Sequence, residues 1–412
     1  MAIADTSGAF QGVHSRRYDL DWLRVIAFGL LIFYHIGMFY VTWGWHVKSA
    51  YAGPAAEPFM SIVNPWRLAL LFFISGVAIR FATDKAPGRL AFARSRLYRL
   101  GLPILMGMIV IVAPQSYFEL RQPGAIEPGY FAFWGDYLKL EQLFPMITPT
   151  WNHLWYLVYL LVYVLLLAPV LPFLRRFAEG AGARALNFVA GGPVRLMLLI
   201  IIPFVIYELT LSRQFPTTHA LFDDWANHAH RFTIFLLGYF AAKHDGFWRS
   251  VHRALALAAG FAVGIWLLGA YVSANEATVA ASWGRVPFIG VVETTLETLY
   301  AWSCIVLLMS LAQRILNRPS KALTYFTGAV FCYYILHQTI IVIAGYYLTQ
   351  LQLGAWPEFL TVMGVTIAGC AGGYEILRRI PYRRPWFGIK APVRRAARAA
   401  TSRTLDAAVE RA

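Results

Sequence analysis

The sequence contains few charged residues for its length. Only 14% of the 412 residues are Asp, Glu, Lys or Arg, whereas 58% are hydrophobic, and apolar runs of membrane-spanning length recur along the whole chain. A water-soluble domain carries far more charge than this. The composition therefore excludes a soluble enzyme and predicts an all-α integral membrane protein with short loops.

Cysteine is also scarce, and several familiar site motifs are missing. Cys304, Cys332 and Cys370 all lie inside apolar runs, and their odd number argues against a disulfide framework. No basic residue adjoins any of them in sequence, so we interpret them as packing residues. The chain lacks the spacing of metal ligands, a Walker loop and a G-x-S-x-G elbow. We therefore expect no metal site and no permanently bound cofactor.

The apolar runs predict about ten transmembrane helices. They lie at residues 20–42, 64–82, 100–118, 152–173, 196–213, 226–242, 254–273, 288–312, 324–349 and 356–377. The first run has no cleavage pattern after it, so we interpret it as a retained helix and not as a signal peptide. The sixth run has the shortest strongly apolar part. We keep it as a span because without it every later loop would change sides of the membrane, and the basic C-terminal tail would lie outside.

Acidic residues are few beside basic ones, 21 against 36. If both termini are cytoplasmic, the inner loops hold most of the basic residues, as the positive-inside rule requires. The net charge of +15 then faces an anionic lipid leaflet, and no nucleic acid is needed to explain it. We predict a cytoplasmic segment at 1–17, a membrane domain at 18–380 and a basic cytoplasmic tail at 381–412. The tail is expected to lie on the membrane surface.

The first predicted helix carries the most polar residues. Arg24 and His35 are eleven residues apart, close to three helical turns, so they share one face about 16 Å apart. Asp21 lies near the same stripe and can pair with Arg24. Such groups are costly inside a bilayer, which favours a functional role. An anion site at Arg24 with chemistry at His35 is one interpretation, and a histidine that only bonds a neighbouring helix is the other.

A second polar cluster stands at the basic entry to the third predicted helix. Arg96 and Arg99 are one turn apart on one face, and a guanidinium pair at a membrane surface suits phosphate groups. The alternative interpretation is that these two arginines only hold this loop on the cytoplasmic side, as the positive-inside rule describes. Other polar residues lie near the ends of the predicted helices, and each taken alone is best explained by a hydrogen bond to a neighbouring helix. They are His153, Glu208, Glu293, Glu297, His337 and Glu375.

The order of these motifs resembles the membrane acyltransferase-three family. Asp21-x-x-Arg24 and His35 come first, followed by Phe72-Phe73-Ile74-Ser75-Gly76 and by Arg96-x-x-Arg99 ahead of Pro103. Within the family, the chain is most similar to the periplasmic glucan succinyltransferase branch. That likeness lies in residues 45–50, 99–103, 153–157, 323–337 and 374–381. The resemblance covers about residues 18–390.

The resemblance implies an enzyme of the bacterial inner membrane. It would transfer an acyl group from a cytoplasmic acyl-CoA to hydroxyl groups of a periplasmic glucan, with succinyl-CoA as the implied donor. It also implies that His35 is catalytic and that Arg24, Arg96 and Arg99 bind the donor. Whether His35 acts as a general base or accepts the acyl group itself stays open.

Other residues of the similar stretches receive supporting roles. We assign these to Asp21, Arg67, His153, Trp155 and His337, and we place Trp45 and His46 on the acceptor side. The chain departs from the family at one point, because many members carry an acid shortly before the Phe-Phe pair, whereas this chain has Ala69 there and Arg67 two residues earlier. Arg67 would bind the free carboxylate of a succinyl group, or it only reaches toward lipid headgroups.

Two other functions fit parts of the same pattern. An O-acetyltransferase acting on another envelope polysaccharide would share the fold and His35. A proton-coupled carrier would use Arg24 and His35 as a relay and would form no covalent bond, and inverted repeats would favour it. Thioester hydrolysis by the purified protein would separate an enzyme from a carrier.

Overall fold

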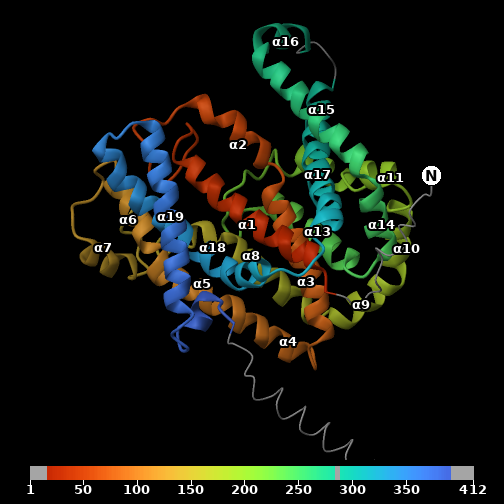
Figure 1. Ribbon diagram of the computed structural model, residues 1–412, viewed down its shortest axis with the longest axis horizontal. Coiled ribbons are helices and arrows are strands. Elements are labelled where there is room, and N and C mark those ends of the chain that lie inside the picture. The colour runs from red at the N-terminus through yellow and green to blue at the C-terminus, as the bar shows by residue number, and fades with distance from the viewer. Residues whose placement is uncertain (1–15, 284–287, 391–412) are drawn as a thin grey trace, which may run out of the picture.

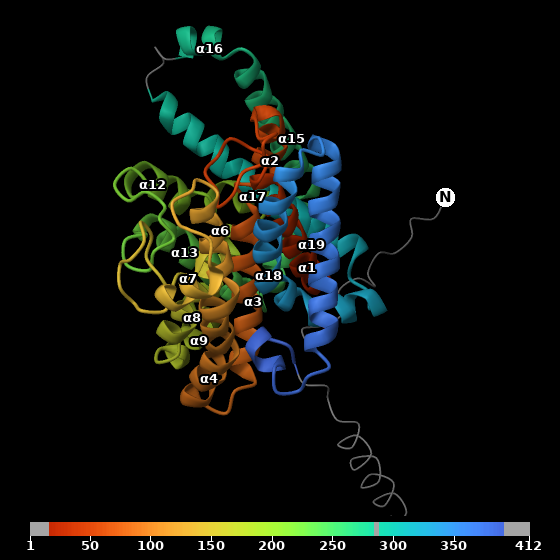
Figure 2. The ribbon, with the colours of Figure 1, turned by 90° about the vertical axis from the view of Figure 1, so that its left-hand side faces the viewer.

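The computed structural model describes residues 16–283 and 288–390, and every regular element within them is a helix. The long helices form one bundle, in which α1 (Tyr18–Met38) contacts α3, α17, α18 and α19. Figures 1 and 2 show α1 and α18 in the middle of this bundle. The predicted class, an all-α integral membrane protein, is confirmed.

The remaining elements follow in chain order. They are η2 (Pro54–Ala56), α2 (Glu57–Val63), α3 (Arg67–Asp84), α4 (Arg89–Arg96), η3 (Leu97–Gly101), α5 (Leu102–Met106), η4 (Gly107–Ile111), α6 (Ala113–Arg121), α7 (Tyr130–Tyr137), η5 (Asn152–Leu154), α8 (Trp155–Leu167), α9 (Leu171–Glu179), α10 (Ala181–Val189), α11 (Pro193–Leu199), α12 (Ile202–Thr210), α13 (Trp225–Ala241), α14 (Asp245–Arg253), α15 (Leu255–Ala274), α16 (Glu276–Trp283), α17 (Ile289–Ile315), α18 (Lys321–Leu348), η6 (Thr349–Leu351), α19 (Ala355–Leu377) and η7 (Arg384–Phe387).

The described residues contain eight helical stretches that are long and apolar enough to cross a membrane, or nine if one bent pair counts as a single span. The bent pair is α8 and α9, which meet at 85°, so the predicted span at 152–173 is broken near its end and is not one continuous helix. Pro169 and Pro172 lie at the bend. Proline cannot donate the next helical hydrogen bond, which explains the break.

The sixth predicted span corresponds to α13, a helix of 17 residues that packs tightly against α3. A Cβ atom added to Gly76 would lie 1.9 Å from the Phe235 carbonyl oxygen, and one added to Gly238 would lie 2.0 Å from the Phe73 carbonyl oxygen. Small residues permit such backbone contact between membrane helices. The Phe72–Gly76 motif therefore contributes to packing, and the short α13 belongs to the bundle.

The third predicted span, at 100–118, lies within a longer helical stretch from Arg89 to Arg121. Two π-helical turns interrupt it, η3 and η4. Such turns add a residue to the local helical turn and often occur at functional sites. Arg96 ends α4 and Arg99 lies inside η3, so the two arginines do not share the regular α-helical spacing that the sequence predicts.

The two ends of the bundle are named here by the orientation that the charges predict. The inner face carries the starts of α1 and α18, and the outer face carries the starts of α3, α8 and α19. After α19, the packed chain continues past Ile380, because Phe387 and Ile389 are buried in the core. The predicted membrane-surface role of the tail falls on residues 391–412, outside the described residues, as do residues 1–15 of the N-terminal segment.

Candidate active site

A cavity of about 660 Å³ lies in the outer half of the bundle. Six residues singled out from the sequence line it, and they come from α1, the loop after α1, α3 and the η5–α8 junction: His35, Trp45, His46, Arg67, His153 and Trp155. These positions are far apart in the chain. The fold thus collects the titratable and aromatic candidates at one place.

His35 and His337 form a hydrogen-bonded pair beside this cavity. Nδ1 of His35 lies 2.7 Å from Nε2 of His337, and the rings are nearly parallel with centroids 5.0 Å apart. Nδ1 of His337 lies 2.7 Å from the Tyr334 carbonyl oxygen, which can only accept, so this nitrogen carries the hydrogen. When both rings are neutral, His337 must accept through Nε2 and His35 must donate through Nδ1. The lone pair of His35 is then on Nε2.

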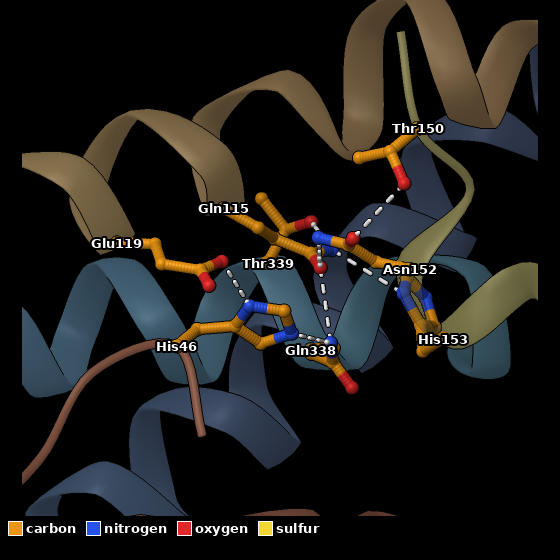
Figure 3. Close-up of polar contacts among 8 residues, drawn as sticks. All are labelled: His46, Gln115, Glu119, Thr150, Asn152, His153, Gln338 and Thr339. Carbon is orange, nitrogen blue, oxygen red and sulfur yellow. Dashed lines mark hydrogen bonds and ion pairs between the residues drawn. The ribbon is translucent and has the colours of Figure 1, made fainter. Parts of the chain in front are cut away.

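The other predicted histidines have both ring nitrogens occupied. His46 donates through Nδ1 to Glu119, 2.5 Å away, and accepts at Nε2 from the Gln338 amide at 2.8 Å. His153 donates through Nε2 to the Ile335 carbonyl oxygen at 3.2 Å. Its Nδ1 accepts from the Gln115 amide at 3.3 Å (Figure 3). Of the four predicted histidines, only His35 has a ring nitrogen without a hydrogen-bond partner in the described chain.

Gln115 of α6 is the centre of a polar network that holds this arrangement together. Its amide also donates to Thr339 at 2.8 Å, and its carbonyl oxygen accepts from Gln338 at 3.0 Å and from Asn152 at 3.2 Å (Figure 3). Fully hydrogen-bonded buried networks make a core rigid. The network fixes α6, α18 and η5 relative to one another, and so fixes the histidines.

Arg67 is 7% exposed and has no carboxylate partner among the described residues. Its Nη1 donates to the Asn64 carbonyl oxygen at 2.9 Å and to the Asn64 side chain, and its guanidinium carbon lies 3.4 Å from the centroid of the Tyr34 ring. Tyr34 and Asn64 also line the cavity. A buried guanidinium without a counter-ion is suited to bind an anion that enters the cavity.

His219 lines the cavity but was not predicted from the sequence. Its ring stacks on Trp155 with centroids 4.3 Å apart, and its backbone N–H donates to buried Asp224 at 3.1 Å. Asp224 also accepts from the Tyr159 hydroxyl at 2.6 Å. His219 lies in the loop before α13 without a recognisable motif around it. Only the fold reveals its place in the site.

Tyr156 and Tyr334 line the cavity, and the buried rings of Phe28 and Phe72 pack against them. We call these four rings the aromatic layer. The Tyr156 hydroxyl is 2.6 Å from the Ser75 hydroxyl, and the Tyr334 hydroxyl donates to the His153 carbonyl oxygen. Arg24 interacts electrostatically with Tyr156 from the inner side.

The remaining predicted residues lie toward the inner face. Asp21 pairs with Arg24 at 3.7 Å, as expected, and with Arg16 at 2.7 Å. Nε of Arg24 and Nε of Arg96 are buried without a hydrogen-bond partner in the described chain. The structure thus divides the candidate residues into an outer group around His35 and an inner cationic group.

No set of three or more His, Cys, Asp or Glu side chains within residues 16–283 and 288–390 is placed to hold a metal ion. The three cysteines are buried and unpaired. The groups that line the cavity are imidazole, guanidinium, amide, phenol and indole groups and the carboxylate of Glu119.

The described residues thus form a bundle of apolar, membrane-length helices, with a hydrogen-bonded histidine pair and a buried guanidinium group at one cavity. The chain belongs to the acyltransferase 3 family, whose acyltransferase domain matches residues 17–375. It is 23% identical over 393 residues to glucans biosynthesis protein C of Escherichia coli O139:H28 (strain E24377A), covering 92% of this chain and 96% of the relative. The protein of the same description from E. coli K12 is similar to the same extent. No solved structure matches the chain.

Proposed function

We propose that this protein transfers a succinyl group from cytoplasmic acyl-CoA to hydroxyl groups of a periplasmic glucan, as an enzyme of the bacterial inner membrane. Membership of the acyltransferase family supports group transfer, and the similarity to glucans biosynthesis proteins supports a glucan acceptor. The observation that carries the proposal is the His35–His337 pair in one cavity with the uncompensated Arg67.

His35 supplies the base in this proposal. Its Nε2 takes the proton of a glucan hydroxyl while the hydroxyl oxygen attacks the thioester carbonyl carbon. The C–O bond forms, the C–S bond breaks, and the departing thiolate receives the proton from the imidazolium. In the alternative route, Nε2 attacks the carbonyl first, and the glucan hydroxyl then cleaves the acyl-histidine. Both routes need an unprotonated Nε2, which the His337 contact favours.

The donor would bind with its phosphates at the inner face, near Arg24, Arg96 and Arg99. The pantetheine arm would then cross roughly half of a 30 Å apolar core to reach His35. The aromatic layer occupies this path, so transfer requires its side chains to move. On the outer side, Trp45 and Trp155 offer flat apolar surfaces to sugar rings within the cavity.

Succinyl is favoured over acetyl because of Arg67. A succinyl group carries a free carboxylate that acetyl lacks, and a buried carboxylate requires a cationic partner. Arg67 lies in the cavity of His35 without such a partner, and Asn64 and Tyr34 hold its guanidinium in place. This contact would select the dicarboxylic donor.

Replacing His337 with phenylalanine is expected to lower the turnover number about tenfold to a hundredfold, with little change in the Michaelis constant for the donor. The ring volume is retained, but the acceptor that fixes the tautomer of His35 is lost. His337→Gln, which restores a side-chain acceptor, should recover part of the activity. The test is the turnover number measured as a function of pH. If His337 had a purely structural role, His337→Phe would lower activity without changing the pH profile. His337→Gln would then not restore activity.

The function is tested by mass spectrometry of periplasmic glucans from cells with and without this protein. A mass increase of succinyl groups that depends on the protein is the expected result. An acetyl increase would instead identify an O-acetyltransferase. Unmodified glucans, together with no thioester turnover by the purified protein, would overturn the proposal.

A further inference from the structure

The loop before α13 presents His219 to the cavity in a backbone conformation that is uncommon for a residue other than glycine. His219 has φ 57°, in the left-handed region. The carboxylate of buried Asp224 holds this turn, because it accepts from the backbone N–H groups of Thr218 and His219, each at 3.1 Å. The carbonyl oxygen of His219 accepts from Nε1 of Trp151 at 3.0 Å. Residues that their surroundings hold in such conformations cluster at ligand sites.

One face of the His219 ring is covered, whereas the ring edge has no partner. The ring stacks on the Trp155 indole with centroids 4.3 Å apart and planes inclined by 28°. Trp155 is buried and His219 is exposed, so the imidazole is the more accessible ring of this stack. Within the described residues, the hydrogen bonds of His219 are all made by its backbone. Both ring nitrogens therefore remain available to a ligand in the cavity.

The chemistry of this ring edge selects the kind of ligand. A neutral imidazole has one N–H donor and one nitrogen lone pair, so its ligand must both accept and donate hydrogen bonds. Sugar hydroxyl groups do both. A succinyl carboxylate only accepts, and Arg67 in the same cavity suits it better. His219 also lies beside the start of α8 at the outer face, the side from which a periplasmic acceptor enters.

We infer that His219 is an acceptor-binding residue, whose imidazole forms hydrogen bonds with hydroxyl groups of the glucan. Trp155 supports the ring from behind, and Asp224 sets the loop that carries it. The inference rests on the proposed function, because the glucan is the acceptor proposed there. His219 holds the sugar, whereas His35 takes the proton.

The test measures initial rates of acyl transfer by the full-length protein in detergent, as a function of glucan concentration at saturating succinyl-CoA. His219→Gly removes the imidazole but suits the left-handed backbone, so the loop should keep its hydrogen bonds to Asp224. The KM for glucan should rise about tenfold, since the contacts to the sugar are lost. The kcat and the KM for succinyl-CoA should stay near the wild-type values.

His219→Asn is the conservative variant. Asparagine tolerates the left-handed conformation, and its amide both donates and accepts, so part of the affinity for glucan should return. Leu140→Gly is the matched control for the backbone. Leu140 has φ 58°, is 81% exposed and does not line the cavity, so its replacement by glycine should leave the KM for glucan unchanged.

Direct binding of glucan, measured by isothermal titration calorimetry, separates this inference from the proposed function. If the wild-type protein binds glucan and His219→Gly binds it equally well, the inference is overturned and the function stands. A rise confined to the KM for succinyl-CoA would also overturn the inference, because His219 would then contact the donor. If the wild-type protein neither binds glucan nor acylates it, the proposed function is overturned and the inference falls with it.

Discussion

Replacing His35 with alanine is expected to reduce acyl transfer by about a hundredfold to ten-thousandfold, the usual contribution of a positioned general base. His46 and His153 have both ring nitrogens occupied, so neither can take its place without breaking existing hydrogen bonds. The substitution does free Nε2 of His337, but His337 is not among the residues that line the cavity. Single-turnover transfer from succinyl-CoA to glucan by purified protein measures the effect.

His230→Ala is the control for this substitution. His230 also lies on a bundle helix, but it does not line the cavity. It should keep nearly all transfer activity. Near-normal transfer by a correctly inserted His35→Ala protein would refute the assignment of His35 as the reacting base.

Arg67→Gln should selectively remove succinyl transfer. The loss of a buried charge-assisted contact to the succinyl carboxylate, about 1.5–3 kcal/mol, corresponds to roughly a tenfold to 150-fold fall in kcat/KM for succinyl-CoA. Acetyl-CoA has no such carboxylate, so its kcat/KM should be unchanged or improved. Competition between the two donors in one reaction, with products separated by mass, measures the selectivity directly.

A guanidinium group can bind a carboxylate through two parallel hydrogen bonds, which predicts a difference between arginine and lysine at this position. Arg67→Lys keeps the charge but loses the planar fork and its position over the Tyr34 ring, so succinyl transfer should recover only in part. Equal succinyl kcat/KM in wild type and Arg67→Gln would show that Arg67 does not contact the acyl group. A parallel fall for both donors would indicate damage to the cavity and no role in selectivity.

The positions of the long helices were well predicted from the sequence, because an apolar run of about 20 residues nearly always forms a membrane-spanning helix. The predicted span at 196–213 corresponds to the stretch Pro193–Thr210, and the predicted span at 356–377 to Ala355–Leu377. Helix geometry was harder to predict. The 85° bend after α8 and the π-helical turns around Arg99 depend on local hydrogen bonding, which an apolar pattern does not record.

The candidate site was predicted residue by residue, but its connections were not. His35 and His337 were both singled out, yet 302 positions separate them, and no spacing rule predicts their hydrogen bond. Gln115 and His219 carried no signal, since an isolated amide in an apolar run or a histidine in a loop is common. Their roles arise from tertiary packing, through which α6 and the loop before α13 reach the cavity.

The aromatic layer also bears on the electrical integrity of the membrane. An enzyme that exposes one site to each compartment risks becoming a leak for protons and small ions, and each elementary charge that crosses dissipates about 2.3 kcal/mol per 100 mV. Phe28 and Phe72 present only carbon at this level, and the hydroxyls of Tyr156 and Tyr334 are already engaged by Ser75 and by the His153 carbonyl oxygen. With no charged group and no unpaired hydroxyl among these four rings, the layer offers protons and small ions no hydrogen-bonded path through it.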